Sequence, residues 1–379
     1  MSLASPTEAQ GPEVTVEALI AVFPQALAAM LAKCRPAARA EQPALEELTS
    51  SAERTRLIQS ASSAVQRDFA ADPVQRKRLR TGRKVRRLVL RSPRDLLIER
   101  GLHELLNQDA SWAHPMSCAY TRGRSTAAPA RAIREWGWLY DGYVKFDGIN
   151  FFESVRHADA VAAVRRQTPD GRIPQIVGSL LKAGEWPDKQ GRGLGTGTVL
   201  APTLGNLVLT APLDELFPRE MASPYGHVSH MSKRVDAELW RRLGPVPLGY
   251  ARYSDDGLVP YTGDRADGHR LEALLQKVFG RLGLRIRTEV GRCADGFEFV
   301  GLRYSPGVSS QQLHVQPGRA LTRRILSEVV RLIEDEGRDQ EEALQARLSR
   351  RAPYLEQHGV DLTEVYNMIS YGLSQMQHR

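Results

Sequence analysis

The sequence has little cysteine and no long apolar run. Its three cysteines among 379 residues, Cys34, Cys118 and Cys293, are too far apart for a C-x-x-C pair or a Cys/His ligand pattern, so neither a zinc site nor a disulfide framework is predicted. A reduced, cytoplasmic setting is therefore expected. The most apolar early stretch, "ALIAVFPQALAAMLAKC", is too short to cross a bilayer, and no basic segment precedes it as in a signal peptide. We expect it to form a pair of buried helices interrupted at Pro24.

Positive charge, by contrast, is in excess. The chain has 52 Lys and Arg against 44 Asp and Glu, a formal net charge of +8 and a sequence pI near 9.5. With 42% hydrophobic and 25% charged residues, it has the composition of an ordinary globular protein, long enough for two or three packed subdomains. The basic balance favours a polyanionic partner, with nucleic acid ahead of an anionic membrane surface, and no membrane partner is expected.

The first part of the chain is predicted to be helical and then strongly basic. Residues 1–12 are rich in Ser, Pro, Gly and Glu, which predicts a frayed terminus. Apolar residues at helical spacing between about 14 and 75 predict three or four helices. The next segment, "RKRLRTGRKVRRLVLRSPR" at 76–94, carries ten Lys or Arg in nineteen residues, with Leu and Val alternating as in a half-buried strand. This combination predicts a surface that contacts phosphates.

The middle of the chain mixes strand and helix patterns. Strands are predicted at "GYVKF", "LGYARY", "GLVPY", "LRIRT" and "FEFVGLRY", and helices at 153–166, 174–184 and 269–282. This mixture predicts an α+β fold in which an antiparallel sheet carries helices on one face. After about residue 315 the pattern predicts amphipathic helices, one ending at Gly337 and another beginning behind Asp361 and Glu364.

Two aspartates stand side by side between two of these predicted strands. In "GYARYSDDGLVPY" we expect Asp255 and Asp256 at the tip of a hairpin, with Gly257 easing the chain out of the turn. In "YVKFDGINFFESV", Asp147 ends a β-rich run. Taken alone, the first pattern is good turn chemistry and the second is typical of a helix cap.

Together, these acids predict a metal site. A strand-end aspartate and a hairpin-tip pair can converge on one edge of a sheet, where cations would relieve their mutual repulsion. Oxygen-only ligands select hard cations, principally Mg²⁺ or Mn²⁺. Two such ions would activate an attacking hydroxyl and stabilise a leaving pyrophosphate in an in-line phosphoryl transfer.

Five blocks, in order over roughly residues 76–305, resemble those of reverse transcriptases. "MSCAYTRGRST" is similar to a fingers block of that family, "KFDGINFFESV" to motif A, and "GLGTGTVLAPTLGNLVLTAPLDELF" to motif B. "YSDD" is similar to the Y-x-D-D of motif C, and "FEFVGLRY" to the F-L-G hairpin that supports the primer end. The resemblance implies a right-hand polymerase with an N-terminal helical extension at 1–75, fingers at 76–139, a palm at 140–308 and a helical thumb at 309–379.

The resemblance also implies roles for particular residues. Asp147, Asp255 and Asp256 would form the catalytic, metal-binding triad. Phe152 falls where the family places the aromatic residue under the sugar, and its bulk would exclude a 2′-hydroxyl and favour deoxynucleotides. Phe151, beside it, is expected to be a core residue.

Further positions match the family's nucleotide and primer–template contacts. The incoming triphosphate would be held by Arg87 and Arg80, with Arg83 and Lys84 as alternatives in so basic a stretch. Thr196 and Gly197 of motif B would contact the nucleotide.

Primer or template contacts are expected at Tyr253, Arg122, Arg124 and Gly301, although solvation at the surface explains the two arginines equally well.

Two blocks depart from the family pattern. Gly195, Thr196 and Gly197 stand where Pro-Gln-Gly is common, and Ala201-Pro202 replaces Ser-Pro, so nucleotide or template contact is expected to differ. The lysine often found near motif D is missing; Arg287 or Arg292 would take its general-acid role, or the role is absent.

The expected activity is RNA-directed DNA synthesis with dNTPs on an RNA template, which could be a dedicated non-coding RNA, to give a DNA product. About 65 residues after the palm are enough for a thumb and too few for added nuclease domains, which favours a stand-alone bacterial enzyme with intron-type character. A role in antiviral defence follows by analogy, and a protein partner or oligomer is left open. Two alternatives remain: a template-independent or protein-primed DNA polymerase of this fold, and an RNA-binding maturase or scaffold without essential polymerase activity.

Overall fold

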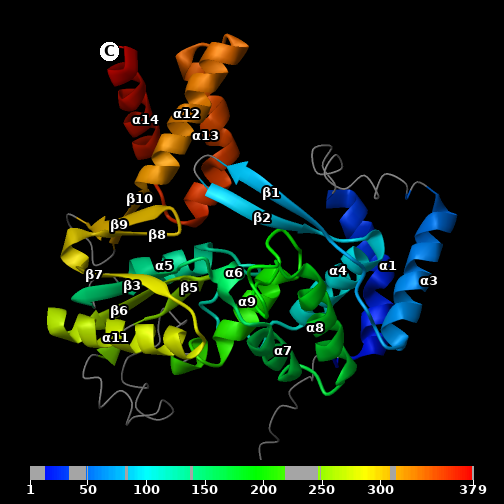
Figure 1. Cartoon of the computed structure of the whole chain (residues 1–379). Coiled ribbons are helices and arrows are strands. Elements are labelled where there is room, and N and C mark those ends of the chain that lie inside the picture. Colours follow the sequence, from blue (N-terminus) through cyan, green and yellow to red (C-terminus); the bar gives the residue numbers. More distant parts are fainter. Residues whose placement is uncertain are drawn as a thin grey trace, which may run out of the picture.

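The chain forms a mixed α+β structure. The computed structural model describes residues 13–33, 48, 50–81, 84–136, 140–217, 246–247, 249–307 and 313–377. Within these residues it contains twelve α-helices and three antiparallel sheets (Figure 1). The predicted α+β class and antiparallel pairing are confirmed. The terminus expected to fray, residues 1–12, lies outside the described residues, as does Cys34.

The largest sheet holds the acidic positions. Its strands run in the order β4-β6-β3-β7, and β5 also pairs with β6. The strands span Gly142–Gly148 (β3), Val246–Pro247 (β4), Ala251–Tyr253 (β5), Asp256–Thr262 (β6) and Ile286–Arg292 (β7). Helix α11 (Arg265–Arg281), which begins with a capping box at Asp264 and Asp267, covers one face. Phe146 of β3 packs on Phe279 of α11 with ring centroids 5.5 Å apart, which fixes that face as buried.

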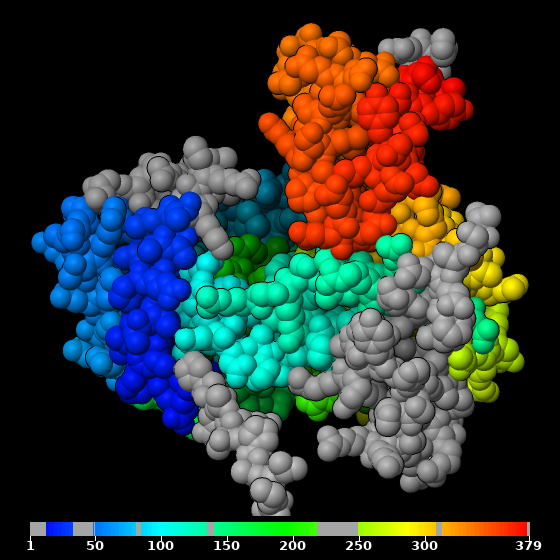
Figure 2. Space-filling view, turned by 180° about the vertical axis from the view of Figure 1, so that it is seen from behind, coloured from blue at the N-terminus to red at the C-terminus, as the bar shows by residue number. Residues whose placement is uncertain are grey.

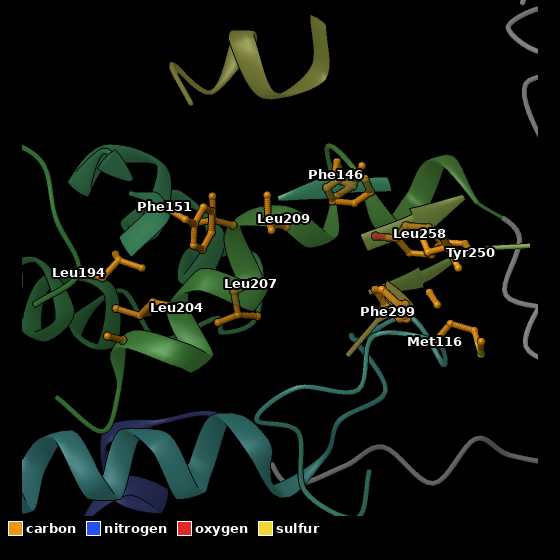
Figure 3. Close-up of a cluster of buried hydrophobic side chains, with 14 of the residues drawn as sticks. Met116, Phe146, Phe151, Leu194, Leu204, Leu207, Leu209, Tyr250, Leu258 and Phe299 are labelled. Atoms are coloured by element: carbon orange, nitrogen blue, oxygen red, sulfur yellow. The ribbon is translucent and has the colours of Figure 1, made fainter. Parts of the chain in front are cut away.

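A helical layer adjoins the sheet. Its members are α1 (Val16–Lys33), α3 (Ser51–Gln66), α4 (Pro93–Gln108), α6 (Phe151–Ser154), α7 (His157–Arg165), α8 (Arg172–Gly184) and α9 (Ala201–Thr210). Helix α5 (Ala127–Trp136) lies apart from this layer and contacts strand β10 (Leu313–Pro317). The core is continuous between the two parts: Figure 3 shows the α9 side chains Leu204, Leu207 and Leu209 beside Phe151, with Phe146 beyond them.

One prediction about the helical layer is wrong. The stretch around Pro24 forms the single helix α1 and not two helices. Proline removes one main-chain hydrogen bond from a helix, but Leu19 and Phe23, in the turn before Pro24, pack α1 against α4. They approach so closely that a Cβ on Gly101 of α4 would lie 2.9 Å from each. Tertiary packing therefore outweighs the local cost of the proline.

A basic two-stranded ribbon projects from this layer. Strands β1 (Gln75–Thr81) and β2 (Lys84–Leu90) pair in antiparallel register from Gln75 opposite Leu90 to Thr81 opposite Lys84. Arg76 anchors the ribbon, because its guanidinium donates to the carbonyl oxygens of Ala183 and Glu185. The basic segment, in which Leu and Val alternate with charged residues, therefore forms a pair of strands, as its periodicity predicts.

The C-terminal part is a small sheet with a helical unit above it. The sheet, in the order β10-β9-β8, comprises Phe297–Phe299 (β8), Leu302–Pro306 (β9) and Leu313–Pro317 (β10). Helices α12 (Arg319–Glu336), α13 (Gln340–Gln357) and α14 (Leu362–Gln377) follow. Figures 1 and 2 show these helices rising from the rest of the molecule. Helix α12 ends at Gly337 in a left-handed conformation (φ +66°), as predicted. Among the described helices, none combines the length and apolarity that a bilayer crossing requires.

Candidate active site

Strand pairing brings the three predicted acids to one edge of the main sheet. Asp147 near the end of β3 lies directly opposite Asp256 at the start of β6. Residues in directly opposed antiparallel positions project from the same face of a sheet, so the two carboxylates share a face. Asp255 is adjacent: its carbonyl accepts a hydrogen bond of 3.1 Å from the amide of Gly148. Its carboxylate also lies close to Gly148, because a Cβ there would be 2.6 Å from Oδ2 of Asp255.

The hairpin that carries Asp255 and Asp256 is tight. Tyr253 of β5 pairs with Asp256 of β6, which leaves a two-residue turn of Ser254 and Asp255. Ser254 adopts φ +61°, a left-handed conformation that is costly for a residue with a Cβ. Strain of this kind persists only where surrounding contacts hold it.

Gly257 has a different role from the predicted one. It lies within β6 and not at the exit of the turn. It is buried opposite Phe146, and a Cβ at position 257 would lie 2.0 Å from Cζ of the Phe146 ring. Glycine is therefore required because an aromatic ring occupies the space where a side chain would be.

The acids hold more negative charge than their neighbours neutralise. Burial, opposed by the nearby Lys145 and reinforced by Asp147 and Asp255, raises the pKa of Asp256 to about 7. Burial, together with the charge of Asp147, also raises the pKa of Asp255. Oδ1 of Asp256 is buried and has no hydrogen-bond partner among the described residues. A buried acceptor without a partner is costly, so this edge of the sheet favours a cation.

The donor chemistry fits Mg²⁺ or Mn²⁺, since all the candidate ligand atoms are carboxylate oxygens. In the described part of the chain, however, no group of three or more Asp, Glu, His or Cys side chains is placed to hold one metal ion. The carboxylates would therefore have to turn toward a common ion from the rotamers seen here.

A pocket brings together three of the predicted nucleotide contacts. Arg87 of β2, Phe152 of α6 and Thr196 of the loop before α9 all line it, with Trp186 and Gly195. Phe152 is half-buried, and its ring packs edge-on against Phe151 at 5.3 Å between centroids. Phe151 is fully within the core, as predicted. The remaining nucleotide candidates lie elsewhere: Arg80 is exposed on β1, and Gly197 is outside the pocket lining.

Arg87 has protein partners in this pocket. Nη1 donates to both carboxylate oxygens of Asp188 at 2.7 Å, and Glu153 lies 4.0 Å from Nε. The guanidinium also stacks over the ring of Trp186, 5.3 Å from its centroid. The Asp188 carboxylate raises the pKa of Arg87. The alternative Arg83 lies outside the described residues, as does the side chain of Lys84.

The unusual motif B segment forms a glycine-dependent loop. Gly195 (φ +75°) and Gly197 (φ +95°) are both left-handed, where glycine is favoured. Thr196 lies between them, and its carbonyl accepts a hydrogen bond of 3.2 Å from the amide of Val89 in β2. The loop is thus fastened to the basic ribbon through its main chain.

The predicted primer and template contacts divide into exposed and internal groups. Arg122 is exposed, and Tyr253 is half-buried with its ring 6.0 Å from that of the exposed Tyr120. The Arg124 guanidinium instead points inward and donates to the carbonyl oxygens of four loop residues, Ala110, Ala113, His114 and Ser117. It therefore stabilises its own loop.

Gly301 lies at the β8–β9 turn, where both turn residues are left-handed: Val300 has φ +50° and Gly301 has φ +78°. Gly301 is exposed, and a Cβ there would meet no atom within 4 Å. The hydroxyl of Tyr354 in α13 donates to the carbonyl oxygen of Val300 at 3.3 Å. The amide of Gly318 donates to the carbonyl oxygen of Gly301 at 2.8 Å. The turn is thus bonded to the segment that begins the helical unit.

The two candidates for the missing lysine lie at opposite ends of β7. Arg287 is paired with Asp147 and is exposed, whereas Arg292 is paired with Gly142 at the far end of the strand. They are five positions apart along the strand, a distance of about 16 Å. Only Arg287 is beside the acids.

Several residues in or near the site could not be predicted from sequence patterns. Trp186 and Asp188 approach Arg87 from a loop about a hundred positions away, and Asp214 pairs with Arg252 beneath the hairpin. Tyr120 lies within a recognised block, and its strained φ of +55° and exposure of 46% are visible only in the structure.

Comparison with known proteins gives a distant relationship. No family model matches the chain. The chain is 23% identical over 256 residues to Protein YkfC of Escherichia coli, a reverse-transcriptase-like protein, and the aligned region covers 58% of this chain. The chain spans 63% of the length of Protein YkfC.

Proposed function

We propose that this protein is an RNA-directed DNA polymerase that uses dNTPs with Mg²⁺ or Mn²⁺. The observation that carries the proposal is the register of β3 and β6, which sets Asp147 opposite Asp256 with Asp255 alongside. The distant similarity to a reverse-transcriptase-like protein supports it. So does the pocket that Arg87, Phe152 and Thr196 share, since the three come from separate parts of the chain.

On this proposal the parts of the fold take the roles of a right hand. Residues 76–139, with the basic ribbon, would be the fingers, and residues 140–308, with the acidic edge, would be the palm. Residues 309–379 would be the thumb, which agrees with the way α12–α14 rise above the rest in Figure 1. Residues 1–75 would be an N-terminal extension, whose described helices α1 and α3 pack on α4.

The residues of the chain would divide the work of phosphoryl transfer. Asp147, Asp255 and Asp256 would hold the metal, which when bound supplies charge neutralisation and activation of the primer hydroxyl. Arg87 would bind the triphosphate after exchanging Asp188 for phosphate oxygens, because a guanidinium fork suits either anion. The Phe152 ring would exclude a 2′-hydroxyl by its bulk.

Primer extension on an RNA template tests the proposal. Purified protein with Mg²⁺ and dNTPs should extend a DNA primer, and Asp255→Ala should abolish extension. Asp335→Ala is the matched control, since this exposed acid lies on α12 away from the site. Extension that persists undiminished in Asp255→Ala would refute the triad assignment.

The sequence of the product separates the alternatives. A templated product is complementary to the RNA supplied, whereas a template-independent polymerase would give a product unrelated to it. If the protein extends no primer and its biological activity survives Asp147→Asn, it is instead an RNA-binding scaffold.

Phe152→Ala examines the sugar contact directly. Removing the ring should raise incorporation of ribonucleotides relative to deoxynucleotides, measured as the ratio of kcat/KM values. An unchanged ratio would contradict the steric argument.

A further inference from the structure

A buried arginine lies directly beneath the hairpin that carries Asp255 and Asp256. Arg252 of β5 is 0% exposed, and its partner Asp214 is 1% exposed. Nε and Nη2 donate to the two carboxylate oxygens of Asp214 at 2.7 and 2.6 Å. Tyr250 donates its hydroxyl to the same carboxylate at 2.5 Å. The ion pair is therefore bidentate and shielded from water.

The remaining nitrogen of the guanidinium reaches the turn itself. Nη1 donates to the carbonyl of Ser254 at 2.6 Å and to the side-chain oxygen of Asn206 at 2.8 Å. The Ser254 carbonyl belongs to the peptide group that joins Ser254 to Asp255. A charged donor on this oxygen fixes the plane of that peptide, and with it the direction in which Asp255 leaves the backbone.

The main chain of Arg252 is held as firmly as its side chain. Its amide donates to the carbonyl of Met116 at 2.9 Å, and its carbonyl accepts from the amide of Cys118 at 3.0 Å. The arginine cannot shift without moving β5. The strained φ of Ser254 is thus held from below by a rigid donor.

Stability alone does not account for this ion pair. Removing two charges from water costs several kcal/mol each, and well-packed apolar residues in place of a buried pair are often as stable or more so. An apolar side chain could fill the same volume, but it could not orient a carbonyl.

The same network reaches the nucleotide pocket. Asn206 belongs to α9, the helix that follows the loop containing Thr196. The neighbouring Gly205 receives Phe151, and a Cβ there would lie 2.9 Å from that ring. Helix α9 therefore supports both the turn and the α6 segment that carries Phe152.

We propose that Arg252, oriented by Asp214, is a positioning residue that holds the Ser254–Asp255 peptide in the conformation required for metal binding and catalysis. The inference rests on the proposed function. Arg252 does not touch metal or substrate, and it acts through the geometry of the turn.

Arg252→Lys tests this role because it keeps the charge and loses the fork. A single ammonium group cannot hold both Asp214 and the Ser254 carbonyl in the observed geometry. The affinity for Mn²⁺, measured by electron paramagnetic resonance of free Mn²⁺, should weaken about 10-fold to 100-fold, as when an outer partner of a metal ligand is lost. The kcat of primer extension should fall by a similar factor, about 10-fold or more, while the KM for dNTP stays within about twofold.

Arg91→Lys is the matched control. Arg91 pairs with Glu99, both side chains are 2% exposed, and Nη2 donates to the carbonyl of Leu180, away from the hairpin. This variant should lose stability as well but keep the Mn²⁺ affinity of the wild type. If Arg252→Lys does not fold, Asp214→Asn keeps the volume and weakens the orientation of Arg252, and the same Mn²⁺ titration applies.

The outcomes separate this inference from the proposed function. Wild-type protein that neither binds Mn²⁺ nor extends a primer refutes the polymerase and the positioning role together. A second outcome refutes the positioning role alone. In it the wild-type protein is active, and Arg252→Lys, or Asp214→Asn in its place, has the same Mn²⁺ affinity and the same kcat per folded molecule as Arg91→Lys.

Discussion

Asp256→Asn should stabilise the metal-free protein at pH 8. In the wild type this carboxylate is ionised at pH 8 although burial and the neighbouring Asp147 and Asp255 disfavour its charge. Its pKa is raised from 3.8 to about 7, so the folded state binds a proton more tightly than the unfolded state does. For an acid with a raised pKa, the stability present at low pH is lost as the pH rises from the unfolded-state pKa of 3.8 to the folded-state pKa of about 7.

The magnitude follows from the shift. A shift of about three pKa units at about 1.4 kcal/mol per unit gives an upper limit of about 4 kcal/mol. Asparagine removes the charge but leaves a buried amide with few partners, so we expect a net gain of about 1 to 3 kcal/mol. In thermal unfolding with EDTA this corresponds to a rise in Tm on the order of a few degrees.

Two changes of condition should reverse or remove the gain. At pH 5 the wild-type carboxyl group is protonated, so the difference between variant and wild type should shrink toward zero. With excess Mg²⁺ at pH 8 the wild type should gain stability from ligand binding and the variant much less, which inverts their order. Asp335→Asn, an exposed substitution on α12, should stay within about 0.5 kcal/mol of the wild type throughout. A metal-free Asp256→Asn protein that melts below the wild type at pH 8 would refute this account of the acidic edge, as would equal stabilisation of both by Mg²⁺.

Three further outcomes are expected. Gly257→Ala should lower the free energy of unfolding, measured with denaturant, by about 3 kcal/mol or more, because the new methyl group would overlap the Phe146 ring. Adding Phe146→Leu should recover part of this loss, and no recovery would contradict the contact. Asp188→Asn should lower the KM for dNTP by about two- to fivefold, since it frees Arg87 from a partly exposed ion pair, and an unchanged KM would place the triphosphate elsewhere. Affinity for primer–template should fall by about 10³ between 50 and 200 mM salt if six phosphates are contacted, and a flat response would exclude an electrostatic mode.

Local pattern in the sequence was sufficient for the main elements. The alternation in the basic segment gave the ribbon, and Gly337 marked the end of a helix. The acids could be assigned to strand ends because strand length and turn chemistry are local properties. Their pairing in register depended on which strands neighbour one another, and the family resemblance suggested that order.

Interactions between distant segments could not be derived in the same way. Nothing near Arg87 in the sequence indicates that Asp188 will pair with it, and nothing in "RGRST" distinguishes the exposed Arg122 from the internally bonded Arg124. Pro24 marked a helix break by its intrinsic preference, but the packing of α1 on α4 decided otherwise. In each case the missing information is a tertiary contact that competes with a local tendency.

The contacts on the outer side of β5 have a consequence for fidelity of folding. The segment at 116–118 bonds to Arg252 on the edge opposite β6, so this short strand is bracketed on both sides. A slip of one residue between β6 and β3 would turn Asp256 to the opposite face, because side chains alternate along a strand. If β5 moved with β6, such a slip would break the hydrogen bonds of β6 to β3 and also those of Arg252 to residues 116–118. The contacts with residues 116–118 also leave β5 with no free edge at Arg252 for another chain to join.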